Sequence, residues 1–230
     1  MKLWLIVCLA LLRQSMAHSW IACSDYRPAD RGLFAATNRN FDPSICKSYA
    51  RGFAYYNQWG VTGFGEDKGY NRQASGSDPA CHFGIDSTLA YSSQYPMASY
   101  TAGQRVRLVW PSKNHDSDVC TNAHIPDVSL KVYMMCGADR ERYASSGYNP
   151  SVSDFTQSKY LLADFKQLAV PDYAAGTPSA WSQGFQNCPF FCDNMDKAVC
   201  FQEFVLPSNM SPGTCTFLWY WQYVSSLRFF

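Results

Sequence analysis

The first seventeen residues are typical of a secretory signal peptide, and export constrains this chain more than any other feature of its sequence. Lys2 gives a positive start, Leu3–Leu12 forms a short apolar core, and small residues stand at the −3 and −1 positions of a cleavage site after Ala17. The apolar core is too short to span a membrane. The sequence therefore predicts a signal peptide at residues 1–17 and a secreted mature chain that begins at His18.

Export places the mature chain in a compartment where disulfides form. Residues 18–230 contain no internal repeat and no low-complexity linker, so we expect a single domain. Nine cysteines remain after the signal peptide has taken Cys8 with it: Cys23, Cys46, Cys81, Cys120, Cys136, Cys188, Cys192, Cys200 and Cys215. Disulfides are favoured over a zinc site even for the cluster formed by the sixth, seventh and eighth of these. Because nine is odd, one thiol is free, pairs between molecules or lacks its partner.

The charge balance excludes some classes of partner. Removal of Lys2 and Arg13 with the signal peptide changes the formal net charge from +1 to −1. A near-neutral chain argues against nucleic acid as the main ligand. No later apolar run has membrane-spanning length, so we expect a soluble extracellular monomer that does not insert into membranes.

Three stretches in the second half alternate between apolar and polar side chains with the period of two that is typical of strands. They cover residues 105–110, 128–134 and 216–223, and each is expected to place one face on a core. Together with the cysteines they predict an all-β fold, an immunoglobulin/fibronectin-III-like β-sandwich with long loops and short helices, stapled by disulfides.

The remaining segments are expected to connect these strands. Residues 46–59 predict a short helix with Ser44 as its N-cap. Residues 60–79, 145–153 and 174–183 are rich in Gly, Ser, Asn and Pro, which indicates long loops.

A histidine at a free N-terminus can chelate one metal ion through its α-amine and its imidazole. Three histidines besides His18 remain as partners, namely His82, His115 and His124. His115 is favoured because it follows the strand predicted at residues 105–110 on a short loop. A plane of two imidazoles and one amine suits Cu(II) and leaves positions open for an oxygen species.

These features resemble a lytic polysaccharide monooxygenase. The resemblance rests on His18, on the strand that leads into Asn114-His115, on Cys120, and on the late segment Cys215-Thr-Phe-Leu-Trp-Tyr-Trp. The opening His-Ser-Trp-Ile-Ala-Cys-Ser-Asp-Tyr-Arg is most similar to the oomycete group that acts on pectin. The resemblance implies that one copper ion is held by His18 and His115, and that a glycosidic bond is cleaved oxidatively after C1 or C4 of a sugar loses hydrogen.

The family normally places an aromatic residue at the axial position of copper, followed by a cysteine. Spacing from Trp221 puts Phe229 nearest to that position, with Tyr223 as a second candidate, and Gln222 is a candidate hydrogen-bond donor to the reactive oxygen. No cysteine follows Phe229, and the cysteine count is odd. We therefore expect the C-terminus to be truncated or divergent.

The resemblance implies pectin as substrate, ahead of cellulose or chitin, together with an external electron donor. Lys113 and His124 are candidates to attract the carboxylates of pectin, while Tyr70, Tyr148 and Tyr173 are candidates either to stack on sugar rings or to anchor loops.

Two other functions remain open. The same scaffold would serve a secreted protein that binds copper or polysaccharide without turnover. A disulfide-rich effector or cell-wall structural protein would contain His18 only incidentally.

Overall fold

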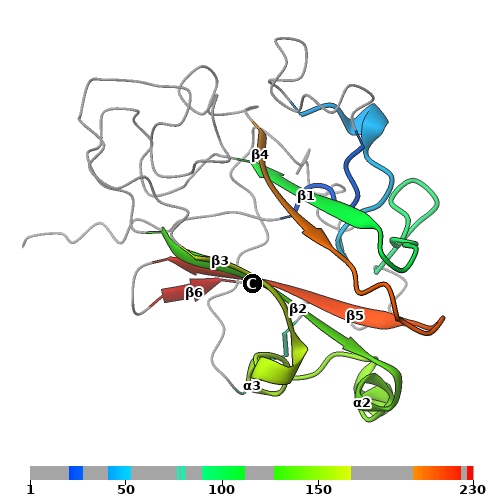
Figure 1. Cartoon of the computed structure of the whole chain (residues 1–230), viewed down its shortest axis with the longest axis vertical. Coiled ribbons are helices and arrows are strands. Elements are labelled where there is room, and N and C mark those ends of the chain that lie inside the picture. Colours follow the sequence, from blue (N-terminus) through cyan, green and yellow to red (C-terminus); the bar gives the residue numbers. More distant parts are fainter. Residues whose placement is uncertain are drawn as a thin grey trace, which may run out of the picture.

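The computed structural model describes residues 21–27, 41–52, 77, 79–80, 90–111, 127–166, 199–223 and 227–229. Their elements, in chain order, are η1 (Pro43–Ile45), β1 (Arg105–Pro111), β2 (Asp127–Cys136), α2 (Gly137–Glu141), η2 (Ala144–Ser146), α3 (Val152–Phe155), η3 (Ser158–Tyr160), β3 (Leu161–Lys166), β4 (Val199–Val205), β5 (Cys215–Tyr223) and β6 (Leu227–Phe229). The described part of the chain is therefore rich in sheet, with a few short helices (Figure 1).

The strands form two small antiparallel sheets. β1 pairs with β4, from Arg105 opposite Val205 to Pro111 opposite Val199. The second sheet has the order β3-β2-β5-β6, and all of its pairs are antiparallel. Figure 1 shows the β1–β4 pair lying beside this larger sheet. The three stretches predicted as strands are confirmed as β1, β2 and β5.

One apolar cluster joins the two sheets. It combines the buried side chains of Val106, Leu108 and Trp110 from β1 and Phe204 from β4 with Leu130 and Val132 from β2. The ring of Trp110 lies 5.7 Å from that of Trp219 on β5, measured between centroids. Because this cluster draws on both sheets, its burial holds them together.

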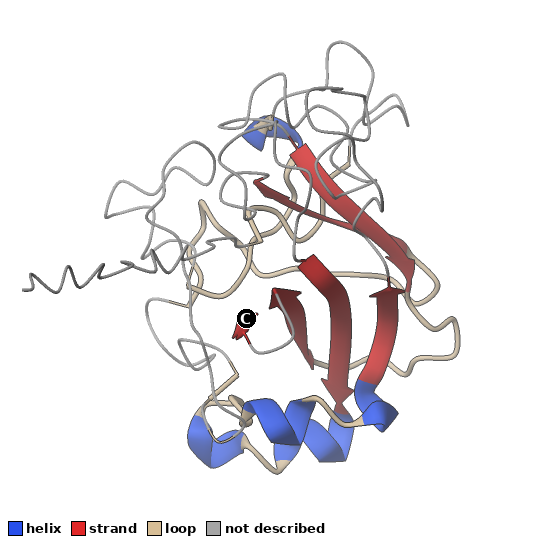
Figure 2. Cartoon of the chain, turned by 90° about the vertical axis from the view of Figure 1, so that its left-hand side faces the viewer, coloured by secondary structure: helices blue, strands red, loops and turns tan. Residues whose placement is uncertain are grey.

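A second apolar cluster covers the opposite face of the larger sheet. Tyr133 and Met135 from β2 and Leu218 from β5 are buried there against Phe155 of α3 and Tyr160 of η3. Figure 2 shows most of the short helices gathered at one end of this sheet. β2 and β5 therefore place one face on the core shared by the two sheets, as predicted, and their other face is covered by α3 and η3.

α3 begins where the sequence predicted a loop at residues 145–153. The Ser151 hydroxyl accepts a hydrogen bond from the Asp154 N–H (3.2 Å), and the Asp154 carboxylate accepts one from the Ser151 N–H (3.3 Å). This reciprocal capping box satisfies two backbone donors and lets a four-residue helix start among loop-forming residues. η2 (Ala144–Ser146) occupies the first two residues of the same stretch. The loop prediction is therefore wrong at both ends of the range.

The helix predicted at residues 46–59 is absent from residues 46–52, and residues 53–59 lie outside the described part. Asp42, rather than Ser44, caps a short helix here, because its carboxylate accepts a hydrogen bond from the Ser44 N–H (2.9 Å). That helix, η1, ends before Cys46, whose backbone is extended and forms an antiparallel bridge with Tyr26. Among the described residues, no helix is long and apolar enough to cross a membrane.

Two disulfides staple the structure. Cys23 is bonded to Cys46, and Cys136 is bonded to Cys215 as an opposed pair at the ends of β2 and β5. Cys200 on β4 is disulfide-bonded as well. These bonds confirm the disulfide prediction and are compatible with an extracellular protein.

Phe155→Ala is expected to lower the free energy of unfolding by about 3–5 kcal/mol, because it empties a fully buried site between α3 and the larger sheet. Guanidinium unfolding of the variant measures this loss. Leu161→Ala, at an exposed apolar residue of β3, is the control and should cost less than about 1 kcal/mol. Equal losses for the two variants would contradict the assigned core.

Candidate functional site

The segment Ile21–Arg27 lies antiparallel to β1. The Val109 carbonyl accepts hydrogen bonds from the N–H groups of Ala22 (2.9 Å) and Cys23 (3.2 Å), and the Val109 N–H donates to the Cys23 carbonyl (2.9 Å). Two residues along β1, the Arg107 carbonyl accepts from the Tyr26 N–H (3.1 Å). β1 therefore has backbone partners on both edges, with β4 on one and this segment on the other.

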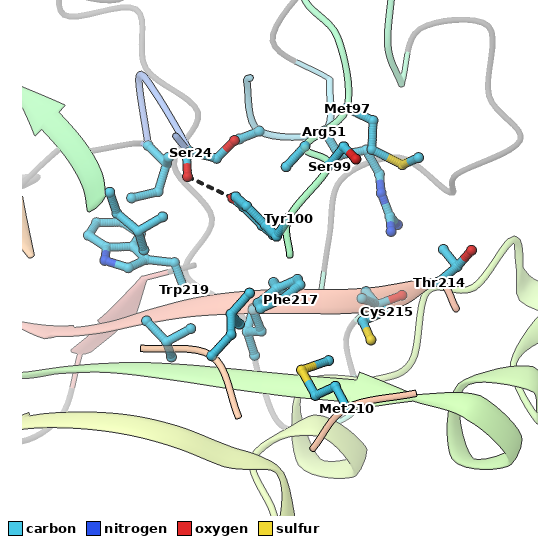
Figure 3. Close-up of a pocket in the computed structure, with 18 of the residues that line it drawn as sticks. Ser24, Arg51, Met97, Ser99, Tyr100, Met210, Thr214, Cys215, Phe217 and Trp219 are labelled. Carbon is cyan, nitrogen blue, oxygen red and sulfur yellow. Dashed lines mark hydrogen bonds between the residues drawn. The ribbon is translucent and has the colours of Figure 1, made fainter. Parts of the chain in front are cut away.

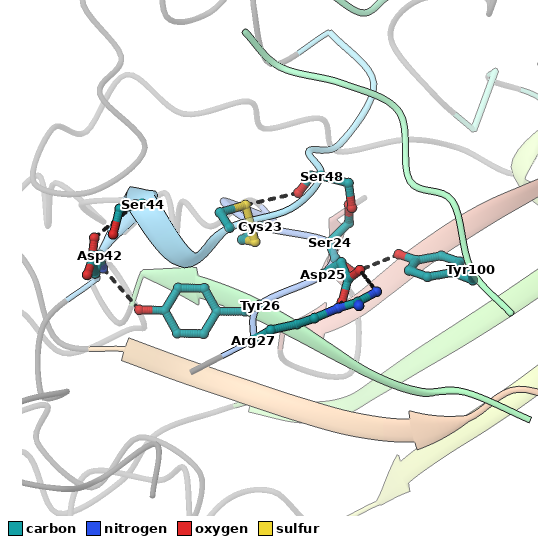
Figure 4. The surroundings of a disulfide bond; sticks show 10 residues. Cys23, Ser24, Asp25, Tyr26, Arg27, Asp42, Ser44, Ser48 and Tyr100 are labelled. Carbon is teal, nitrogen blue, oxygen red and sulfur yellow. Dashed lines mark hydrogen bonds and ion pairs between the residues drawn. A yellow bond between two sulfur atoms is a disulfide. The ribbon is translucent and has the colours of Figure 1, made fainter. Parts of the chain in front are cut away.

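A second chain segment, residues 42–48, fixes Ile21–Arg27 from the side away from β1. The Cys23–Cys46 disulfide joins the two segments (Figure 4). The Ser24 N–H donates to the Ser48 carbonyl (2.9 Å), and the Lys47 N–H donates to the Asp25 carbonyl (2.9 Å). One disulfide and two backbone hydrogen bonds, all within a few residues, therefore fix the path of Ile21–Arg27.

Side chains around this segment add a buried polar network. The Asp25 carboxylate is almost fully buried and forms an ion pair with the Arg27 guanidinium, which raises the pKa of Arg27. The Tyr26 hydroxyl accepts a hydrogen bond from the Asp42 N–H (3.0 Å), and burial raises the pKa of Tyr26. The ion pair and the hydrogen bond thus give partners to polar groups that would be costly to bury unpaired.

Tyr100 connects this network to the larger sheet. Its hydroxyl donates to the Ser24 carbonyl (2.7 Å), as Figure 4 shows, and its ring meets that of Phe217 edge-on with centroids 5.9 Å apart. The hydroxyls of Ser24 and Ser48 lie 2.8 Å apart. Burial raises the pKa of Tyr100 to about 12. Sequence patterns do not identify this group, because its members are far apart in the chain and are individually ordinary.

Alkaline pH is expected to weaken the fold through Tyr100. Since its pKa is near 12 in the folded chain and about 10 when unfolded, its contribution of about 2–3 kcal/mol is complete below pH ~10 and lost as the pH rises toward ~12. Tyr100→Phe should remove that part of the pH dependence while costing about 1 kcal/mol at neutral pH. Guanidinium unfolding at several pH values tests this, and parallel pH profiles for both proteins would contradict it.

The predicted metal ligands His18 and His115 lie outside the described residues, as do Lys113 and His124. All four histidines of the chain lie outside the described residues. Among the residues that the structure describes, no group of three or more metal-ligating side chains is present. The described segments nevertheless begin three residues after His18 and end four residues before His115.

The other two candidates lie on paired strands. Gln222 of β5 pairs with Arg228 of β6, and Phe229 pairs with Trp221. The structure therefore brings Gln222 and Phe229 to adjacent positions at one end of the larger sheet. The same end of β5 pairs with Asp127, three residues after His124.

One of the candidate sugar-stacking residues has a different role. The Arg140 guanidinium lies 3.7 Å from the ring centroid of Tyr148 and occupies a face of that ring. Arg140 is itself buried and donates a hydrogen bond to Thr216 (3.2 Å). Tyr148 is therefore a loop anchor, while Tyr70 and Tyr173 lie outside the described residues.

Comparison of the chain with protein-family models, with characterised proteins and with solved structures finds no match.

Proposed function

We propose that this chain is a secreted copper-dependent lytic polysaccharide monooxygenase that holds one copper ion between His18 and His115. The observation that carries the proposal is the antiparallel pairing of Cys23 with Val109. The two chains of an antiparallel pair run in opposite directions, so the N-terminal end of one lies beside the C-terminal end of the other. The chain toward His18 and the chain toward His115 therefore leave the pairing in the same direction.

The short lengths of chain that lead from the pairing to the two histidines support the same conclusion. Fully extended, the chain from Ala22 to His18 spans at most about 14 Å, and the chain from Val109 to His115 at most about 21 Å. Both histidines are thus within reach of one ion at that end of β1.

The donor atoms suit copper. An α-amine and two imidazoles give three nitrogen ligands, which Cu(II) binds more tightly than other divalent first-row ions. When bound, copper would supply one-electron chemistry with oxygen or peroxide that oxidises a C–H bond beside a glycosidic linkage. The role of the chain is to fix the two histidines, and the Cys23–Cys46 disulfide contributes by anchoring the segment five residues after His18.

We propose further that the two sheets belong to an immunoglobulin/fibronectin-III-like β-sandwich. The support is the single apolar cluster that both sheets share, in which Val106 and Trp110 from one sheet meet Leu130 and Val132 from the other. Side chains from two inner faces that interdigitate in this way form the core of a sandwich.

The remaining roles follow from the resemblance in sequence. Phe229 is proposed as the axial neighbour of copper and Gln222 as a hydrogen-bond donor to the reactive oxygen, and both lie where β5 and β6 pair at one end of the larger sheet. Pectin is proposed as the substrate, with Lys113 and His124 attracting its carboxylates, and an external reductant supplies the electrons.

Correctly processed protein, with His18 verified as the first residue by mass spectrometry, provides the test. It should bind one Cu(II) tightly and release oxidised oligogalacturonides from homogalacturonan only when copper, reductant and peroxide are all present. Tight copper without oxidised products would support the non-catalytic alternative. Failure to bind copper tightly would overturn both copper-dependent functions.

A further inference from the structure

The tripeptide Asn209-Met210-Ser211 matches the acceptor pattern of N-linked glycosylation, in which Asn is followed by any residue but proline and then by Ser or Thr. The chain contains one other Asn-x-Ser, at residues 149–151, and Pro150 excludes it. The pattern is informative in exported proteins, where it marks a surface loop. Its use here therefore depends on the export that the sequence predicts.

The structure leaves both functional side chains of this tripeptide accessible. Asn209 and Ser211 are exposed in the turn between β4 and β5. Met210 is partly buried, packs against the cluster that joins the two sheets, and lines a cavity of about 760 Å³ together with Phe217 and Trp219 (Figure 3). The methionine thus anchors the turn while the residues on either side of it stay in solvent.

Backbone hydrogen bonds hold this turn at one end of the β1–β4 pair. The Leu206 N–H donates to the Gln104 carbonyl (2.9 Å), and the Gly103 N–H donates to the Pro207 carbonyl (3.3 Å). Both bonds continue the pairing past the end at which β1 begins and β4 stops. A bulky group on Asn209 therefore leaves the molecule at that end of the two strands.

This end of β1 is the one away from His115. The strand runs from Arg105 to Pro111, which is about 20 Å at roughly 3.3 Å per residue, and the chain then continues toward His115. A group on Asn209 thus begins about one strand length from the end at which copper is proposed to bind. This spatial consequence rests on the proposed function, whereas the modification itself does not.

We propose that Asn209 is an N-glycosylation site, which places an oligosaccharide at the end of the β1–β4 pair opposite the proposed copper site. The donor is a lipid-linked oligosaccharide pyrophosphate of the secretory pathway. The Asn209 side-chain nitrogen loses one proton and bonds to the anomeric carbon of the first sugar. The bond from that carbon to the pyrophosphate oxygen breaks, the lipid pyrophosphate leaves, and nothing is oxidised or reduced.

Pro212 limits how fully the site is used. The residue before a proline is held in extended conformations, so the backbone of Ser211 is less free to adapt to the transferase. We therefore expect the native sequence to give a mixture of glycosylated and bare chains. Pro212→Ala should raise the glycosylated fraction.

The full chain, secreted with its own signal peptide by a eukaryotic host, provides the test. Intact mass spectrometry should find a fraction of mature chains that is heavier by one oligosaccharide. Peptide N-glycosidase in water labelled with heavy oxygen should release the sugar and leave one heavy oxygen at position 209. Secreted chains with no glycosylated fraction, or a glycan at another position, would overturn the proposal.

Variants within the turn locate the acceptor. Asn209→Gln and Ser211→Ala should each abolish the glycan, and Ser211→Thr should keep it because the hydroxyl is retained. Ser208→Ala is the matched control, since Ser208 is exposed in the same turn but outside the tripeptide, and it should be glycosylated as the native chain is. A glycan that persists in Ser211→Ala, or that is lost in Ser208→Ala, would contradict the assignment.

Copper binding separates this proposal from the proposed oxidative function. Native protein and Asn209→Gln should bind Cu(II) with the same affinity, because the glycan leaves from the far end of β1. A copper affinity that rises when the glycan is removed would refute the opposite-end placement. Failure of both proteins to bind copper would refute the oxidative function and leave the glycan, measured by mass, as support for the site at Asn209.

Discussion

Alanine at position 115 is expected to lower the affinity for Cu(II) by about two to three orders of magnitude, because one of three nitrogen donors is lost. A single glycine placed before His18 should have an effect of similar size, since it converts the α-amine into an amide that no longer binds copper. Both changes are made outside the described residues. Competition titration against a chelator of known affinity measures the loss, and electron paramagnetic resonance reports the change in nitrogen ligation.

His82→Ala serves as the control and should leave copper affinity within about threefold of the native value. Production of oxidised oligogalacturonides should fall with copper affinity in the first two proteins and persist in the control. Tight copper binding that survives both the added glycine and His115→Ala would refute the two-histidine site.

Removal of the Cys136–Cys215 disulfide is expected to lower the free energy of unfolding by about 4–5 kcal/mol, because the bond closes a loop of 79 residues in the unfolded chain. The Cys23–Cys46 bond closes 23 residues, so its removal should cost about 3–4 kcal/mol. Paired alanine substitutions and guanidinium unfolding without reductant measure both values.

The variant that loses less stability should lose more copper affinity. Cys23→Ala with Cys46→Ala releases the segment that follows His18, whereas Cys136→Ala with Cys215→Ala acts at the other end of β5. We therefore expect the first pair to weaken copper binding more although it destabilises the fold less. A copper affinity that simply follows global stability would contradict the anchoring role of Cys23–Cys46.

The strands that sequence could predict are those with a long alternation. β5 has an aromatic residue at every second position from Phe217 to Tyr223, whereas β4 carries Gln202 and Glu203 side by side and β3 begins with three apolar residues in a row. Neither segment therefore has the period of two that predicts a strand. Alternation also failed to indicate that α3 covers the second face of β2 and β5.

The candidate site likewise combines features that the sequence predicts with features that it could not predict. The sequence predicts His18 and His115 from residue type and from the cleavage site, and it predicts disulfides from the compartment. It could not predict that Cys23 bonds Cys46, because nine cysteines allow many pairings. Nor could it predict the bond from Tyr100 to Ser24, which joins residues 76 positions apart through an ordinary hydroxyl and a backbone carbonyl.

The pairing of Cys23 with Val109 also sets an order of events during synthesis. The segment that follows the predicted signal peptide leaves the ribosome first, but its partner strand is completed only about 86 residues later, or roughly 4–17 s at ordinary rates of translation. During that interval the segment has no β1 to pair with. We therefore expect signal peptidase to act on a still unfolded N-terminus, and the new α-amine to be carried into place only when β1 arrives.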